Sequence, residues 1–191
     1  MFEADNRSLS AVFLDRDGVM NKNREDYVKS LEELKFLPGA LEAVARLSQA
    51  GFRIVIISNQ QGVGRGLISP ETLKQINHSF LSRLADLGGG VAGVYYCPHL
   101  KEDDCGCRKP KPGMLLKAAA ELKIDLARSI FIGDSKSDME TARAAGCGAI
   151  LVLSGKTTSE QLSSLNPKPD HVAADLPQAA EWILKRFRPA D

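Results

Sequence analysis

The sequence has no long hydrophobic run. Its first apolar stretch covers only residues 11–14 and is ended by Asp15. A signal peptide needs about 7–15 consecutive apolar residues, and a membrane-spanning helix needs about 20. We therefore expect a cytoplasmic protein with no membrane partner.

A surplus of either charge is also missing. The 191 residues include 25 Lys and Arg against 24 Asp and Glu, which leaves a formal net charge of +1. A dedicated nucleic-acid binder needs a basic excess to contact phosphates, so this composition argues against one. The hydrophobic fraction of 43% is ordinary for a globular protein. We expect one domain covering residues 1–191, present as a monomer.

Two glycine-rich phosphate-binding motifs are absent. Neither the P-loop pattern G-x4-G-K-[ST] nor the glycine-rich loop of protein kinases occurs in the chain. The glycines at Gly62, Gly64 and Gly66 fit neither pattern, and they do not directly follow the first predicted strand. A kinase is therefore not expected.

Short apolar runs rich in branched residues alternate with helical patterns, which indicates an α/β fold. The predicted strands are residues 11–14, 54–57, 94–96, 130–132 and 150–153, and the predicted helices lie between Pro38 and Gly51, between Ser69 and Gly88, and at 112–122, 136–145 and 176–187. Nearly continuous apolarity is typical of parallel strands covered on both faces, so we predict a three-layer, Rossmann-like sheet. Chemistry is then expected in the loops after the strands.

A pair of carboxylates follows the first predicted strand. Asp15 and Asp17 are two residues apart and can project to the same side of an extended segment. Like charges so close raise each other's pKa unless a cation lies between them. One carboxylate can act as a nucleophile while the other donates and later accepts a proton. An ordinary solvated turn would explain the same residues.

Polar residues also follow two later strands. The Ser58 hydroxyl can donate to a phosphate oxygen, and Asp134 can supply an oxygen ligand to Mg²⁺. A helix cap explains Asp134 equally well, and the positive end of a helix dipole explains Asp138. Between these strands, Arg108 and Lys109 begin a basic segment stiffened by two prolines. Such runs are usually solvated, but a Lys can pair with a phosphoryl group and an Arg with a second anion.

In this order, and at successive strand ends, these motifs resemble the haloacid dehalogenase (HAD) superfamily of phosphohydrolases over residues 11–153. The resemblance implies that Asp15 attacks phosphorus and forms an aspartyl-phosphate. It implies that Asp17 is the general acid and base. Ser58 and Lys109 would then hold the transferring phosphoryl group. Phosphoryl transfer depends mostly on positioning and charge neutralisation, which such groups supply.

The same resemblance implies a catalytic Mg²⁺. Its ligands would be Asp15, the backbone carbonyl of Asp17, and Asp134. Carboxylate and carbonyl oxygens are the ligands that this cation prefers.

A cluster of soft ligands precedes the basic segment. Cys97, His99, Cys105 and Cys107 form the pattern C-x-H-x5-C-x-C within the zinc loop, residues 97–107. Three thiolates and one imidazole suit a closed, structural Zn²⁺ site. Buried free cysteines beside an unrelated histidine are the alternative. A metal here would stabilise a loop that has little core of its own.

The zinc loop followed by Arg108 and Lys109 narrows the resemblance to two related phosphatase families, which act on heptose bisphosphate and on histidinol phosphate. It implies a minimal cap and a small phosphorylated sugar as substrate, with the C7 phosphate of heptose 1,7-bisphosphate favoured. Arg108 would contact the rest of the substrate, and the sugar pocket would be lined by Asn23, Tyr27, Asn59, Gln60 and Gln61. Histidinol phosphate and other small phosphosugars stay open as alternatives. Outside the enzymes, the alternative is a phosphate-binding or zinc-mediated interaction module.

Overall fold

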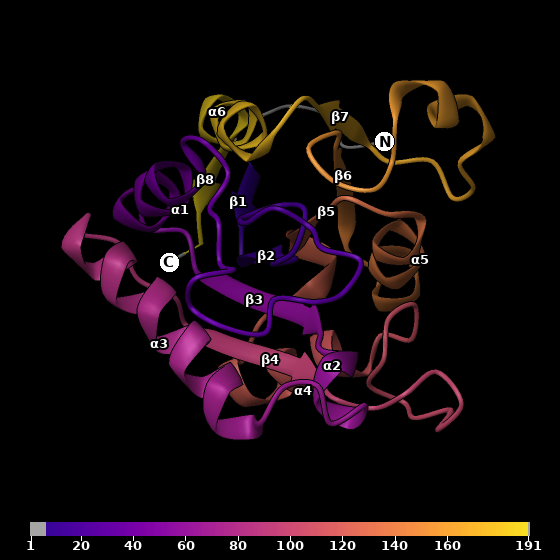
Figure 1. Cartoon of the computed structure of the whole chain (residues 1–191). Helices are drawn as coiled ribbons and strands as arrows, with labels where there is room; N and C mark the ends of the chain where they lie inside the picture. The colour runs from indigo at the N-terminus through magenta and orange to yellow at the C-terminus, as the bar shows by residue number, and fades with distance from the viewer. Residues whose placement is uncertain (1–6, 191) are drawn as a thin grey trace.

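The protein is described by a computed structural model covering residues 7–190. Its centre is a six-stranded parallel sheet with the strand order β4-β3-β2-β5-β6-β7 (Figure 1). The strands are β2 (Ala11–Leu14), β3 (Ile54–Asn59), β4 (Gly93–Cys97), β5 (Ser129–Gly133), β6 (Gly148–Val152) and β7 (His171–Ala173). All the strands predicted from the sequence are present, and β7 is an additional edge strand.

Helices cover both faces of this sheet. They are α1 (Ala40–Gln49), α2 (Gln61–Gly64), α3 (Pro70–Asp86), α4 (Gly113–Leu122), α5 (Lys136–Ala145) and α6 (Leu176–Arg186), with 3-10 turns at Leu126–Arg128 and Ser159–Ser164. On β2, Val12 and Leu14 pack in the cluster that includes α1, α3 and α6, whereas Ala11 and Phe13 face the cluster that includes α4 and α5. Since successive strand residues point to opposite faces, the apolar strands fill two cores. The three-layer, Rossmann-like α/β fold is thus confirmed.

Capping residues in the sequence mark some of the helix ends correctly. Ser69 caps α3, because its hydroxyl accepts a hydrogen bond from the Thr72 backbone N–H at 3.0 Å, and Pro70 is the first helical residue. The first helix lies between Pro38 and Gly51, as predicted. It begins at Ala40 because Gly39 adopts a left-handed conformation, with φ of 69°. Pro38 therefore precedes the helix, although proline also suits a first helical turn.

A second, two-stranded parallel sheet was not predicted. It pairs β1 (Arg7–Leu9) with β8 (Phe187–Pro189), so the final helix ends at Arg186. Trp182 of that helix stacks on His171 of edge strand β7, with ring centroids 4.4 Å apart. Trp182 thus packs at the sheet edge.

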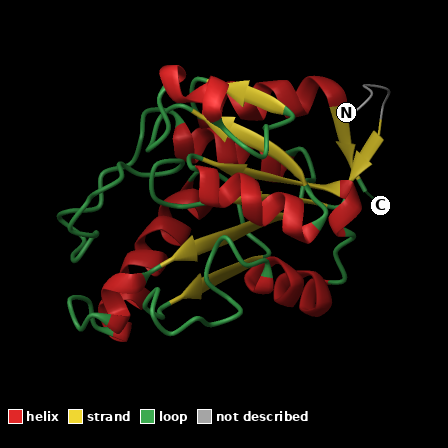
Figure 2. Ribbon diagram, turned by 90° about the vertical axis from the view of Figure 1, so that its right-hand side faces the viewer, coloured by secondary structure: helices red, strands yellow, loops and turns green. Residues whose placement is uncertain are grey.

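The strands of the large sheet share one direction, and long loops lie beyond their carboxyl ends (Figure 2). These loops hold the side chains predicted to be functional. None of the helices between residues 7 and 190 combines the length and the apolarity that crossing a membrane requires.

Candidate active site

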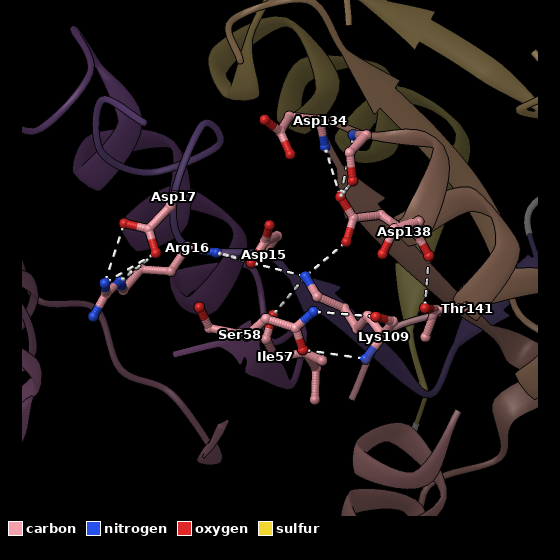
Figure 3. Close-up of polar contacts among 12 residues, drawn as sticks. Asp15, Arg16, Asp17, Ile57, Ser58, Lys109, Asp134, Asp138 and Thr141 are labelled. Carbon is pink, nitrogen blue, oxygen red and sulfur yellow. Dashed lines mark hydrogen bonds and ion pairs between the residues drawn. The ribbon is translucent and has the colours of Figure 1, made fainter. Parts of the chain in front are cut away.

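Four of the predicted catalytic and metal-binding groups meet at the carboxyl edge of the sheet (Figure 3). Asp15 follows β2, Ser58 lies at the end of β3, Asp134 follows β5, and Lys109 lies between β4 and α4. A pocket of about 950 Å³ opens over this edge, and Asp15, Ser58 and Lys109 contribute to its lining. The parallel topology thus gathers residues that are far apart in the sequence.

The Lys109 ammonium lies between two carboxylates. Its Nζ is 2.9 Å from Asp15 Oδ1 and 2.6 Å from Asp138 Oδ1, and only 3% of the side chain is exposed. Burial alone would lower the pKa of Lys109, but the charges of Asp138 and Asp15 outweigh it and raise that pKa. The lysine is therefore held as a cation beside the predicted nucleophile.

Asp138 is a site residue that the sequence prediction missed. Its Oδ2 accepts hydrogen bonds from the backbone N–H groups of Asp134 and Ser135, at 3.2 and 3.1 Å, and from Ser135 Oγ at 2.6 Å. The other oxygen pairs with Lys109. Although burial opposes ionisation, the Lys109 charge lowers the pKa of Asp138. The S-x-x-D spacing from Ser135 indicates a helix cap, which is present, but it carries no sign of the lysine.

Three carboxylates are concentrated in this site. Ligand oxygens of Asp15, Asp134 and Asp138 lie within 4.8 Å of one another, and all three residues are buried. Burial raises the pKa of Asp15 to about 6, although Lys109 opposes the shift. Burial and the charges of Asp15 and Asp138 raise the pKa of Asp134 to about 7. A divalent cation would neutralise this charge, and the oxygen donors suit Mg²⁺.

The backbone makes room for Asp134. A Cβ on Gly18 would lie 2.2 Å from Asp134 Oδ2, and one on Gly155 would lie 2.0 Å from the same atom. Gly18 also has φ of +91°, which side chains rarely adopt. Oδ2 accepts a hydrogen bond from the Lys156 backbone N–H at 2.8 Å. Two glycines therefore allow the loops after β2 and β6 to close around this carboxylate.

The Asp17 carboxylate is turned toward its own loop. Arg16 pairs with it at 2.9 Å, and Asn21 Nδ2 and Gln60 Nε2 each donate to it at 2.8 Å. Burial alone would raise the pKa of Asp17, but the Arg16 charge and the hydrogen bonds from Asn21 and Gln60 lower it. In Figure 3 this carboxylate points to Arg16 and away from Asp15.

All of the residues predicted to line a sugar pocket do lie around the cavity, namely Asn23, Tyr27, Asn59, Gln60, Gln61 and Arg108. Some of their polar groups already have protein partners. Asn59 Nδ2 donates to the Lys109 carbonyl at 3.2 Å, and Asn59 Oδ1 accepts from the Lys109 N–H at 3.1 Å. Arg108 donates to Gln61 Oε1 at 2.8 Å. Asn59 thus holds the backbone of Lys109.

The predicted zinc ligands also come together. Cys107 Sγ lies 3.2 Å from both Cys97 Sγ and His99 Nδ1, and Cys105 Sγ is 3.5 Å from the other two sulfurs. Ligand atoms around a tetrahedral Zn²⁺ are about 3.5–3.8 Å apart, given its bond lengths of about 2.0–2.3 Å. The four ligand atoms are gathered as around such an ion, at slightly shorter separations. The remaining cysteine, Cys147, is buried in the core.

Comparison with known proteins agrees with this geometry. Residues 106–179 match the family described as HAD-hydrolase-like. The chain is 44% identical over 178 residues to D-glycero-beta-D-manno-heptose-1,7-bisphosphate 7-phosphatase of Pseudomonas aeruginosa, covering 93% of this chain and 99% of that protein. The chain belongs to this family of heptose bisphosphate phosphatases. The homologue of the same name from Bordetella bronchiseptica is 40% identical over 177 residues, covering 93% and 99% of the two chains.

Solved structures of heptose bisphosphate phosphatases also have the same fold as this protein. A crystal structure of D,D-heptose 1,7-bisphosphate phosphatase from B. bronchiseptica, complexed with magnesium and phosphate, matches with a TM-score of 0.85 and 39% identity, covering 92% of this chain and 98% of that chain. The corresponding phosphatase from Burkholderia thailandensis matches with a TM-score of 0.67 and 32% identity, covering 91% and 97%.

Proposed function

We propose that the protein hydrolyses the C7 phosphate ester of D-glycero-β-D-manno-heptose 1,7-bisphosphate. The observation that carries this proposal is the pairing of Asp15 with a buried Lys109 at 2.9 Å, in a pocket that also contains Asp17 and Ser58. This is the arrangement that an aspartyl-phosphate mechanism needs. The similarity to heptose bisphosphate phosphatases over nearly the whole chain supports the substrate.

In the first step, a carboxylate oxygen of Asp15 attacks phosphorus, and the bond from phosphorus to the C7 oxygen breaks. Lys109 and Ser58 hold the phosphoryl oxygens. Asp17, whose contacts with Arg16, Asn21 and Gln60 favour the ionised form, must first take up a proton, which it then donates to the leaving oxygen. In the second step, Asp17 takes a proton from water, which attacks the aspartyl-phosphate. Inorganic phosphate leaves, and Asp15 is restored as a carboxylate.

A Mg²⁺ ion would be held by Asp15, the backbone carbonyl of Asp17, and Asp134. When bound, it neutralises charge on the phosphoryl group and on the buried carboxylates. Asp138 is not expected to bind the Mg²⁺, since its oxygens already have partners within the protein. Its role is to keep Lys109 in place.

Mg²⁺ should stabilise the protein more at about pH 8 than at about pH 5. The pKa of Asp15 is raised to about 6 and that of Asp134 to about 7, mainly by burial. A carboxyl group with a raised folded-state pKa stabilises the fold at low pH, and this contribution is lost as the pH rises toward the folded-state value. Mg²⁺ offsets that loss by binding the ionised groups. Thermal melts with MgCl₂ and in magnesium-free buffer at both pH values measure the difference, without a chelator that would also remove Zn²⁺, and an equal gain at both would contradict the site.

We also propose that the zinc loop holds one structural Zn²⁺. Replacing Cys105 and Cys107 together by Ser should lower the zinc content from about one equivalent to below about 0.1, because two thiolate ligands are lost. Metal analysis of the purified protein measures this, and Cys147→Ala is the control that should retain zinc. Unchanged zinc content in the double variant would rule out the proposed zinc site.

The substrate proposal is tested by phosphate release from two substrates. We expect kcat/KM for heptose 1,7-bisphosphate to exceed that for histidinol phosphate by at least about 10²-fold, since the two leaving groups differ in several hydrogen-bonding positions. Efficient hydrolysis of histidinol phosphate without activity on the heptose would overturn the proposal in favour of the second family.

A further inference from the structure

The Gln60 side chain lies between two groups of the proposed mechanism. Its Nε2 donates to Asp17 Oδ2 at 2.8 Å and to Ser58 Oγ at 2.7 Å. A primary amide nitrogen has two hydrogens, so these two bonds use its whole donor capacity. Only 2% of the residue is exposed.

The backbone of Gln60 is fixed as well. Its N–H donates to the Cys97 carbonyl at 2.7 Å, and its own carbonyl accepts from the Val63 N–H at 3.1 Å. It stands between the end of β3 and the first residue of α2. The position of the amide is therefore set by the neighbouring strand β4 and by the following turn.

The bond to Asp17 joins two loops. The other side-chain donors to this carboxylate in the described part of the chain, Arg16 and Asn21, come from the loop after β2. Gln60 comes from the end of β3. It thus ties the carboxylate to the end of the neighbouring strand, which also carries Ser58.

The bond to Ser58 sets the direction of a hydroxyl hydrogen. A hydroxyl oxygen carries one hydrogen and two lone pairs. Since Gln60 donates to that oxygen, the Ser58 hydrogen is left to donate elsewhere. A phosphoryl oxygen above the strand end is the acceptor that the proposed reaction supplies.

We propose that Gln60 is a positioning residue, which orients the proton-transferring carboxylate of Asp17 and the phosphate-binding hydroxyl of Ser58 through one amide. This role rests on the proposed phosphatase chemistry. It differs from the sugar contact expected from the sequence, because both amide hydrogens are already used inside the protein. Loss of Gln60 should therefore slow the chemical step, and the effect should be larger for a leaving group that must be protonated as it departs.

The test compares an alkyl and an aryl phosphate ester in Gln60→Met, a substitution of similar length without donors. Loss of a positioned general acid costs about 10²–10⁴-fold for leaving groups that need a proton. For heptose 1,7-bisphosphate we expect kcat to fall by about 10²-fold with KM changed less than about threefold. For 4-nitrophenyl phosphate, whose leaving group departs without a proton, the rapid-quench burst of nitrophenolate should slow by less than about tenfold.

Two other variants complete the test. Gln60→Asn keeps an amide but places it one methylene short. It should therefore also lose more activity on the alkyl ester than on the aryl ester, with a smaller fall in kcat than Gln60→Met. It replaces Gln60→Met in the test if that variant does not fold. Gln75→Met, on the exposed side of α3, is the matched control with unchanged kinetics. A higher KM for the heptose at unchanged kcat would make Gln60 a sugar ligand. Equal losses on both esters would leave only a structural role. Either result overturns the proposal.

Failure of the proposed substrate gives a different pattern. Wild-type protein would then hydrolyse 4-nitrophenyl phosphate but not the heptose. The selectivity of the Gln60 variants is in that case measured with whichever alkyl phosphate is turned over.

Discussion

Replacing Asp15 by Asn is expected to lower kcat at least about 10³-fold, because an amide cannot attack phosphorus to form the acyl-phosphate. The protein should remain folded. Burial raises the pKa of Asp15 to about 6, so a neutral group at this place relieves an unfavourable charge. Lys109 keeps Asp138 as its partner at 2.6 Å.

Phosphate release and thermal melting measure the two effects of Asp15→Asn separately. Asp86→Asn, at the exposed end of α3, is the control and should change neither. Trapping with radiolabelled substrate should yield a phosphorylated protein from the wild type and none from Asp15→Asn. Undiminished turnover in Asp15→Asn would exclude the aspartyl-phosphate mechanism. A non-catalytic phosphate-binding module, the alternative class, predicts no turnover in either protein.

Replacing Lys109 by Met is expected to affect activity and stability together. The side chain is 3% exposed and pairs with two carboxylates, so its loss leaves Asp15 and Asp138 without their cation. Removing one partner of a buried ion pair costs about 3–5 kcal/mol in the free energy of unfolding. The phosphoryl group also loses a charged partner, so kcat should fall by about 10²–10³-fold.

A second substitution separates these consequences. In Lys109→Met/Asp138→Asn the unpaired charge at position 138 is removed, so part of the lost stability should return while activity stays low. Urea denaturation in magnesium-free buffer without a chelator measures the stability, and Lys111→Met is the control. Lys111 is 44% exposed and pairs with an exposed Asp104, so its loss should cost less than about 1 kcal/mol. A stable and active Lys109→Met protein would contradict the role of this lysine.

Some elements could not be predicted because they have no local pattern. Strands β1, β7 and β8 are three residues long, and alternation or continuous apolarity cannot be read over so short a span. They exist because a partner strand lies beside them. The predicted monomer, the single domain of residues 1–191 and the roles assigned to the site residues stay predictions.

Some contacts in the site likewise could not be predicted from the sequence. From the sequence, Asp138 is explained by its position at a helix N-terminus, and Gln60 is predicted to line the sugar pocket. The first explanation was incomplete, since Asp138 also pairs with Lys109. For Gln60, the structure shows both amide hydrogens bonded to Asp17 and Ser58. No spacing rule connects Asp138 to Lys109 or Gln60 to Asp17, because the members of each pair lie in segments far apart in the sequence.

The sequence by itself determined the α/β alternation, the set of polar residues after the strands and the zinc-ligand cluster. Each depends on short-range information: apolar runs mark the strands, and the four soft ligands fall within residues 97–107. Only the tertiary structure decided which charges share a partner. Lys109 meets Asp15 and Asp138 because the strand order β4-β3-β2-β5 brings the segments that follow β4, β2 and β5 to one edge. Side-chain distances across that edge are set by the packed sheet and helices, and a linear pattern does not contain them.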